Sequence, residues 1–151
     1  MTTTVAFEDL TSMAGDSLGA GRWLEVDQAR IDTFADATDD HQWIHVDPER
    51  AKDGPFGGPI AHGYLTLSLV IPLWTELLDV TGVTTKVNYG LNKVRFPAPV
   101  PSGARIRLSG TLAEVTEVAG GGVQLTPDLV VEIENGGKPA CVLQPVFRFY
   151  P

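Results

Sequence analysis

The residues best suited to chemistry in this sequence are an acid and a histidine that lie close together. Asp40 and His45 are five positions apart, in a segment that we expect to be an irregular connection between two helices. Neighbours on one helical face are three or four positions apart, so only a bent loop would point both side chains into one cavity. A carboxylate beside an imidazole can hold a water molecule, and either group can move a proton. The alternative is that Asp40 caps a helix end and His45 is a partly buried, hydrogen-bonded histidine, with Asp39 facing solvent.

A second candidate site is the glycine that follows the third histidine. Gly63 lies in the stretch Gly57-Gly58-Pro59-Ile60-Ala61-His62-Gly63-Tyr64, in the first turn of a predicted long helix. Its N–H then has no intrahelical acceptor and sits at the positive end of the helix macrodipole. Such a donor can polarise a carbonyl oxygen as it becomes an enolate. The alternative is close packing of helix and sheet at Gly63. His62 is more often structural, bonded to a loop backbone group.

The remaining candidates carry weaker signals. Cys141 lies in an apolar strand without an activating partner, so we expect an inert core residue. Trp43 lies inside the loop that holds Asp40 and His45. The basic residues concentrate at Lys93, Arg95, Arg105 and Arg107. They either meet phosphates at the mouth of a groove or form the solvent-facing side of a sheet.

Composition limits the class of protein. The chain has 151 residues with a formal net charge of −8, which argues against a free-standing nucleic-acid binder. One cysteine excludes an intrachain disulfide and a cysteine-rich zinc site. We see no signal peptide, and the apolar stretch 60–78 is too interrupted for a membrane span. We therefore expect one domain over residues 1–151, with 1–14 a candidate loosely ordered segment. The expected location is cytoplasmic, and the expected partners are small molecules or copies of the chain.

The first half of the chain must position these residues with helices. Asp27 is a plausible N-cap for a helix whose apolar face includes Ile31 and Phe34, and Asp47-Pro48 starts a second, short helix. Residues 60–78 form the longest helix candidate. It is apolar nearly all round and is therefore predicted to be buried. Pro72 should kink this helix or begin its last segment.

The second half reads as about four long antiparallel strands. Apolar and polar residues alternate through 104–109 and 123–134, and the alternation through 87–96 changes phase at residues 92–93, which predicts a bulge. Turn residues occur at 101–103, 120–122 and 135–137, and the last strand spans about 140–149. A 19-residue helix and a 9-residue strand both span roughly 30 Å. The prediction is an α+β fold in which a twisted sheet wraps a single helix.

Two motifs together resemble those of a known family. The segment Asp40-His41-Gln42-Trp43-Ile44-His45-Val46-Asp47-Pro48, followed by Gly58-Pro59-Ile60-Ala61-His62-Gly63, resembles the MaoC-like hydratases and dehydratases, including the (R)-specific enoyl-CoA hydratases. Residues 88–100 resemble the strand that follows the central helix in that family. The resemblance covers about residues 15–150. It implies the hot dog fold, a long central helix wrapped by an antiparallel sheet.

The resemblance also implies an activity. Asp40 and His45 would activate the water that adds to C3 of a trans-2-enoyl thioester and would transfer the proton at C2, giving an (R)-3-hydroxyacyl product by syn addition. The Gly63 N–H would bind the thioester oxygen. The substrate would be a thioester of CoA or of an acyl carrier protein, the assembly a homodimer, and no metal or other cofactor would be needed. Candidate substrate-binding residues are His62, Tyr64, Trp43, Lys93 and Arg95.

One departure and two alternatives stay open at this point. The family loop usually reads Asp-x-Asn-Pro-x-His, and here Gln42 and Trp43 replace Asn and Pro, which puts the loop geometry in doubt. The alternative functions are a hot dog acyl-CoA thioesterase and a non-catalytic acyl-thioester binding protein. The acyl chain is expected to pass beside the central helix, near Leu65, Leu69 and Trp74, with Ser68 on the same helix. Because that helix fills the core, a second copy should complete the groove.

Overall fold

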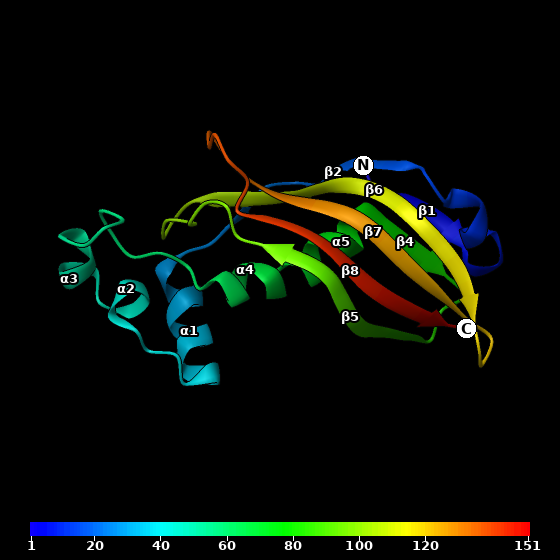
Figure 1. The fold of residues 1–151 in the computed structure, drawn as a ribbon, viewed down its shortest axis with the longest axis horizontal. Coiled ribbons are helices and arrows are strands. Elements are labelled where there is room, and N and C mark those ends of the chain that lie inside the picture. The colour runs from blue at the N-terminus through cyan, green and yellow to red at the C-terminus, as the bar shows by residue number, and fades with distance from the viewer.

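The computed structural model describes residues 1–151, and most of them belong to one curved sheet and the helices on it (Figure 1). The six-stranded sheet has the order β2-β6-β7-β8-β5, and β3 also pairs with β6. Its pairings are all antiparallel. The strands are β2 Ser17–Ala20, β3 Leu24–Glu25, β5 Thr85–Arg95, β6 Arg105–Val118, β7 Gly122–Ile133 and β8 Cys141–Tyr150.

The helices divide into two groups. Beyond one end of the sheet lie α1 Gln28–Thr38, α2 Trp43–Val46 and α3 Pro48–Lys52, while α4 Gly63–Ser68 and α5 Val70–Leu77 run along one face of the sheet (Figure 1). The predicted caps are confirmed, because the carboxylate of Asp27 accepts from Arg30 N–H and that of Asp47 accepts from Arg50 N–H. These two caps fix where α1 and α3 begin.

The central helix is the core of the fold, as predicted, but it is shorter and broken. Instead of running over 60–78, it is divided at Leu69 and ends at Leu77, and Leu78 opens a strand. Pro72 lies in the first turn of α5 and has no N–H to donate to the Ser68 carbonyl, which explains a break at this point. The helices bury Leu65, Leu73 and Leu77 in a core of 27 residues, to which β6, β7 and β8 all contribute.

Residues 1–14 take part in this structure. The strand β1 Thr3–Ala6 pairs in parallel with β4 Leu78–Thr81, and the 3-10 helix η1 spans Phe7–Met13. Leu10 and Met13 of η1 are buried in the core, at 0% and 8% exposure. The segment that the sequence marked as a candidate for loose order therefore covers one end of the central helix.

The four long strands confirm the alternation in the sequence, and β5 departs from it in one respect. The phase change at 92–93 is a register shift between Leu91 and Lys93, and a second shift lies between Asn88 and Gly90. Unlike β7 and β8, however, β5 is exposed along nearly its whole length and pairs with β8 along one edge only. Its Tyr89 side chain is 58% exposed. No helix of the structure has the length and apolar character needed to cross a membrane.

Candidate active site

Asp40 is presented by the turn that ends α1. The helix stops at Thr38, and Asp39 adopts a left-handed backbone conformation with φ of 59°, which reverses the chain. Asp39 is exposed to solvent, as the sequence predicted, but Asp40 is exposed too, so exposure does not distinguish the two. The Asp40 side chain lines a pocket of about 200 Å³ together with His45, His62, Gly63, Tyr64 and Phe96. The turn therefore delivers a carboxylate to a small pocket without burying it.

His45 lies on the short helix α2 with its ring nitrogens in distinct roles. The side chain is 6% exposed, and Nδ1 lies 2.7 Å from the Ile60 carbonyl oxygen. Because a carbonyl can only accept, Nδ1 carries the proton and Nε2 keeps its lone pair. The Gln28 amide donates to the His45 backbone carbonyl at 2.7 Å, which ties α2 to α1. In its neutral form His45 therefore keeps a free basic nitrogen at Nε2.

The surroundings of His45 favour that neutral form. Burial lowers the pKa of His45 below its ordinary value of 6.5, and the neighbouring His62 lowers it further. The bond to Ile60 and the charge of Asp40 oppose this change and raise the pKa. The net effect is a base that stays unprotonated at neutral pH.

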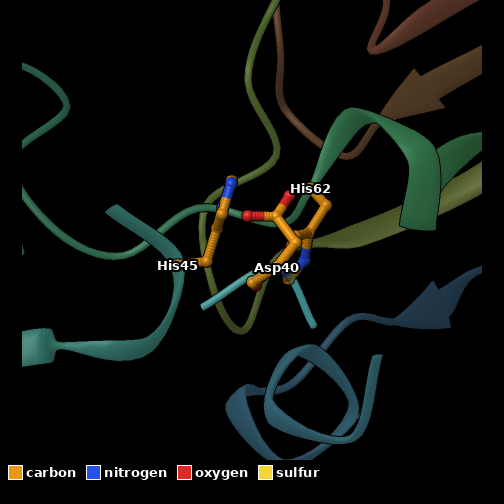
Figure 2. Close-up of side chains that lie close together, drawn as sticks. All are labelled: Asp40, His45 and His62. Carbon is orange, nitrogen blue, oxygen red and sulfur yellow. The ribbon is translucent and has the colours of Figure 1, made fainter. Parts of the chain in front are cut away.

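His62 packs against both members of the predicted pair. Its ring stacks on the His45 ring with centroids 3.9 Å apart and an interplanar angle of 24°, and Phe34 packs nearby at 4.9 Å. His62 Nε2–H donates to the Asp40 backbone carbonyl at 2.9 Å. Figure 2 shows the three side chains gathered together, with the Asp40 carboxylate beside the imidazoles. His62 also lines the pocket, with only 2% of its surface exposed.

Gly63 supplies a free backbone donor at the same pocket. It is the first residue of α4, and no backbone or side-chain acceptor takes its N–H. Since α4 has only six residues, the donor itself matters more here than the macrodipole of a long helix. A Cβ added at Gly63 would lie 3.4 Å from the Phe96 ring, so the glycine also permits close packing. The close packing expected at Gly63 is present, and its N–H is free, so the glycine remains a candidate donor to a thioester oxygen.

Comparison with known proteins identifies the family. A family model described as a MaoC like domain matches residues 9–132 of the chain. The chain belongs to the MaoC-like family. It is 49% identical over 149 residues to 3-hydroxyacyl-thioester dehydratase Z of Mycobacterium tuberculosis, with 99% of each chain covered. It is 45% identical over 138 residues to nodulation protein N of Rhizobium leguminosarum, covering 90% of this chain and 86% of that protein.

Solved structures agree on the architecture of this MaoC-like chain. The (R)-hydratase of A. caviae aligns with a TM-score of 0.62 at 24% identity, covering 91% of this chain and 96% of that one. At this identity the likeness concerns the fold. The hot dog fold implied by the sequence motifs is confirmed: an antiparallel sheet curves around a central helix.

The three grouped side chains of the MaoC-like site are poorly arranged for a metal ion. Ligand atoms of Asp40, His45 and His62 lie within 4.8 Å of one another. A bound ion must lie close to the plane of each imidazole that ligates it, at about 2.0–2.1 Å from the nitrogen for zinc. Two rings stacked at 3.9 Å and 24° do not converge on such a point without rotating. The arrangement suits proton transfer better than ligation.

The other sequence candidates lie outside the pocket or have partners of their own. His41 is exposed and bonds Asp36 at 2.8 Å. Trp43 stacks under the Arg50 guanidinium, 4.4 Å from its ring centroid. Burial raises the pKa of Cys141 to about 11, which agrees with an inert core thiol. Of the four basic candidates, Arg105 pairs with Glu134 and Arg107 pairs with Glu132. Lys93 and Arg95 lie exposed at the end of β5 nearer the pocket.

A second cavity lies beside the central helix but is not lined by the residues that the sequence analysis named for an acyl tunnel. A groove of about 240 Å³ lies between the central helix and β5, lined in part by Leu67, Ser68, Ile71 and Leu91. Leu65, Leu69 and Trp74, past which the sequence analysis placed the tunnel, are instead buried at 3–6% exposure and do not line this groove. All three belong to the hydrophobic core.

Sequence reasoning did not find three residues that shape the site. Gln28 fixes the His45 backbone, Phe34 packs on His62, and Phe96 lines the pocket. Phe96 stands in the segment that resembles the family, so the motif carried a signal for it. Gln28 and Phe34 lie on a helix whose pattern shows only an apolar face, which does not reveal what that face contacts.

Proposed function

We propose that this chain is an (R)-specific hydro-lyase that adds water to trans-2-enoyl thioesters and catalyses the reverse dehydration of (R)-3-hydroxyacyl thioesters. The observation that carries the proposal is one pocket holding a carboxylate, an imidazole with a free Nε2 and an unpaired backbone N–H. The name of the relative that is 49% identical, a 3-hydroxyacyl-thioester dehydratase, supports the same reaction class.

The proposed chemistry uses each of these groups once. Water lies between the Asp40 carboxylate and His45 Nε2, which accept hydrogen bonds from its two hydrogens. One O–H bond breaks as the oxygen bonds to C3, and the released proton is delivered to C2. Because both groups face the pocket from one side, oxygen and proton reach the same face of the double bond, which is syn addition. Gly63 N–H binds the thioester oxygen, on which negative charge develops.

We propose that the acyl chain of the bound thioester extends from the pocket along α4. Gly63 and Leu67 are four positions apart on this helix, as are Tyr64 and Ser68, so each pair shares a face. The groove beside β5 thus continues the side of α4 that begins at the pocket. This groove is open, and a partner surface is needed to enclose an apolar chain.

We propose that a second copy of the chain encloses the groove. Exposed apolar side chains gather on β5 and on the neighbouring surface of the central helix: Tyr64, Ile71, Val87, Tyr89, Leu91 and Phe96. The free edge of β5 also presents backbone groups that can pair with another strand. Leu91→Arg should give monomers in sedimentation experiments, whereas a wild-type chain that sediments as a monomer would contradict the homodimer.

The carrier group is proposed to follow the basic end of β5. Lys93 and Arg95 have no carboxylate partner, unlike Arg105 and Arg107, so they are free to meet phosphates. We propose CoA or acyl carrier protein thioesters as substrates, with no metal or other cofactor. Neutral His45 already supplies the base that a metal-bound hydroxide would otherwise provide.

The experiment that tests the function is hydration of crotonyl-CoA. Loss of the enoyl absorbance, with formation of the (R)-3-hydroxy product shown by chiral analysis, is the expected result. A thiol-trapping reagent in a parallel reaction detects free CoA. Release of CoA without hydration would indicate a thioesterase, and tight binding without turnover would indicate an acyl-thioester binding protein. A chain-length series of trans-2-enoyl-CoA substrates then measures how far the groove extends.

A further inference from the structure

His62 is connected to every part of the pocket that the proposed reaction uses. Its Nε2–H donates to the backbone carbonyl of Asp40 at 2.9 Å, and its ring stacks on that of His45 at 3.9 Å. Its own backbone leads directly into Gly63 at the start of α4. One buried side chain therefore joins three segments that are separated along the chain (Figure 2).

We propose that His62 is a positioning residue, which holds the Asp40 loop and the His45 ring in a fixed arrangement relative to the Gly63 N–H. This proposal rests on the hydro-lyase function proposed above. Its strongest support is that the bond from His62 is the single hydrogen bond made by Asp40, backbone or side chain. Without it, nothing polar would tie this exposed residue to the pocket. The position of the Asp40 backbone, from which the carboxylate projects, therefore depends on His62.

Only an imidazole meets both requirements at this position. The bond to Asp40 needs an N–H at the far end of the side chain, and the contact with His45 needs a flat ring. Because the Asp40 carbonyl must accept, Nε2 of His62 carries the proton. Nδ1 is buried without a hydrogen-bond partner. An apolar residue would avoid the cost of this unpaired group, so its presence is better explained by function than by packing.

Two substitutions separate the two contacts. His62→Gln retains an N–H near the position of Nε2 but removes the ring, whereas His62→Phe retains the ring but leaves the Asp40 carbonyl without its donor. We expect kcat to fall about 10²-fold in His62→Phe and about 10-fold in His62→Gln, because misplacement of a reacting group by about 1 Å costs up to two orders of magnitude. KM should change little, since His62 presents only 2% of its surface to the pocket.

A second measurement needs no substrate. The titration of His45 is followed by NMR of the imidazole nitrogens in the wild type and in both variants. The ionisable groups that face His45 are Asp40, which raises its pKa, and His62, which lowers it. The other polar contacts are the neutral Gln28 amide and the Ile60 carbonyl. Removing His62 should therefore move the His45 midpoint to higher pH, with Nδ1 still the protonated nitrogen at high pH.

His41→Gln is the matched control. It removes the other non-catalytic histidine, which is exposed and bonded to Asp36, and should leave both kcat and the His45 titration unchanged. The proposal is overturned if both His62 variants keep kcat within about twofold of the wild type. If the wild type shows no hydration or dehydration, the proposed function fails, and an unchanged His45 midpoint would then overturn the positioning role independently. If His62→Phe does not fold, His62→Gln decides on the same criteria.

Discussion

The end of the molecule that holds the pocket is built differently from the sheet. Strands β6, β7 and β8 are joined by long antiparallel backbone ladders and bury one face in the core. The pocket end consists of short helices and turns joined by side-chain-to-backbone bonds, from Gln28 to His45, from His45 to Ile60 and from His62 to Asp40. Backbone ladders tolerate many side chains, whereas each of these bonds needs one residue type. Stability should therefore lie mainly in the sheet, and activity in the pocket end.

The largest expected effect comes from the pair itself. Asp40→Asn and His45→Gln should each lower kcat about 10³-fold, because a positioned acid or base contributes about 10²–10⁴-fold. Asp40 is exposed and bonded only through its backbone, so Asp40→Asn should leave the melting temperature nearly unchanged. Steady-state kinetics and thermal unfolding measure the two quantities. Asp39→Asn is the control, since asparagine also accepts a left-handed backbone. Equal losses from Asp39→Asn and Asp40→Asn would refute the assignment of Asp40.

A core substitution in the sheet should show the reverse behaviour. Leu125 on β7 is 0% exposed, so Leu125→Ala should lower the free energy of unfolding by about 2–5 kcal/mol through lost burial and a residual cavity. At a temperature where the variant is folded, kcat should stay close to that of the wild type. Urea unfolding and kinetics on the same preparation test both parts. A large loss of kcat in fully folded Leu125→Ala would show that the two regions are not separable.

This difference also explains what could be predicted from the sequence. Alternation predicted the long strands, and the Asp27 and Asp47 caps predicted two helix starts, because both signals are local. Pro72 likewise gave a local signal for the division of the central helix. The parallel pairing of β1 with β4 depends on contacts between distant segments, and local patterns do not contain it. The sequence did not reveal that β5 is exposed. A strand shows the same alternation of apolar and polar residues whether its apolar face is covered by its own chain or by another.

The same difference between local signals and contacts of distant segments applies to the candidate site. The acid, the histidine and the glycine were found from residue type, spacing and the family motifs, and the structure places them around one pocket. The bond from His62 to Asp40 spans 22 positions and the stacking on His45 spans 17, so neither could be read from spacing. Residues that perform chemistry leave a compositional signal, whereas the residues that hold them are revealed by packing.

Gly63→Ala tests the point where the two regions meet. The N–H remains, but the added methyl group would lie 3.4 Å from the partly exposed Phe96 ring and would narrow the space for a thioester oxygen. We expect kcat/KM to fall about 10-fold, with little change in melting temperature because alanine suits a helix. Gly58→Ala is the matched control, since a Cβ there meets nothing within 4 Å. A Gly63→Ala enzyme with wild-type kcat/KM would place the oxygen elsewhere.

Charge at the end of β5 should have a smaller, salt-dependent effect. Lys93→Gln and Arg95→Gln should each raise KM for an enoyl-CoA about 2–5-fold at low ionic strength, and the effect should shrink in salt because exposed charges are screened. Arg107→Gln removes the same charge from a residue already paired with Glu132, so KM should not change. KM measured at two salt concentrations tests this. An equal rise in all three variants would indicate a general field rather than a binding site at β5.

The smallest effect that we expect is a shift of the acid limb in the pH profile of activity. The direction of this shift follows from the burial of His45. The base must be unprotonated to act, so kcat/KM falls as the pH drops through the His45 pKa. Burial lowers this pKa, so the acid limb should lie below the ordinary value of 6.5. The same shift weakens the fold in acid, because below the unfolded-state pKa the unfolded chain binds a proton that folded His45 resists. A pH profile of kcat/KM measures the limb, and a limb above 6.5 would mean that the charge of Asp40 outweighs burial. In that case more water reaches the pocket than its packing indicates. The pocket end would then differ even more from the water-excluding core of the sheet.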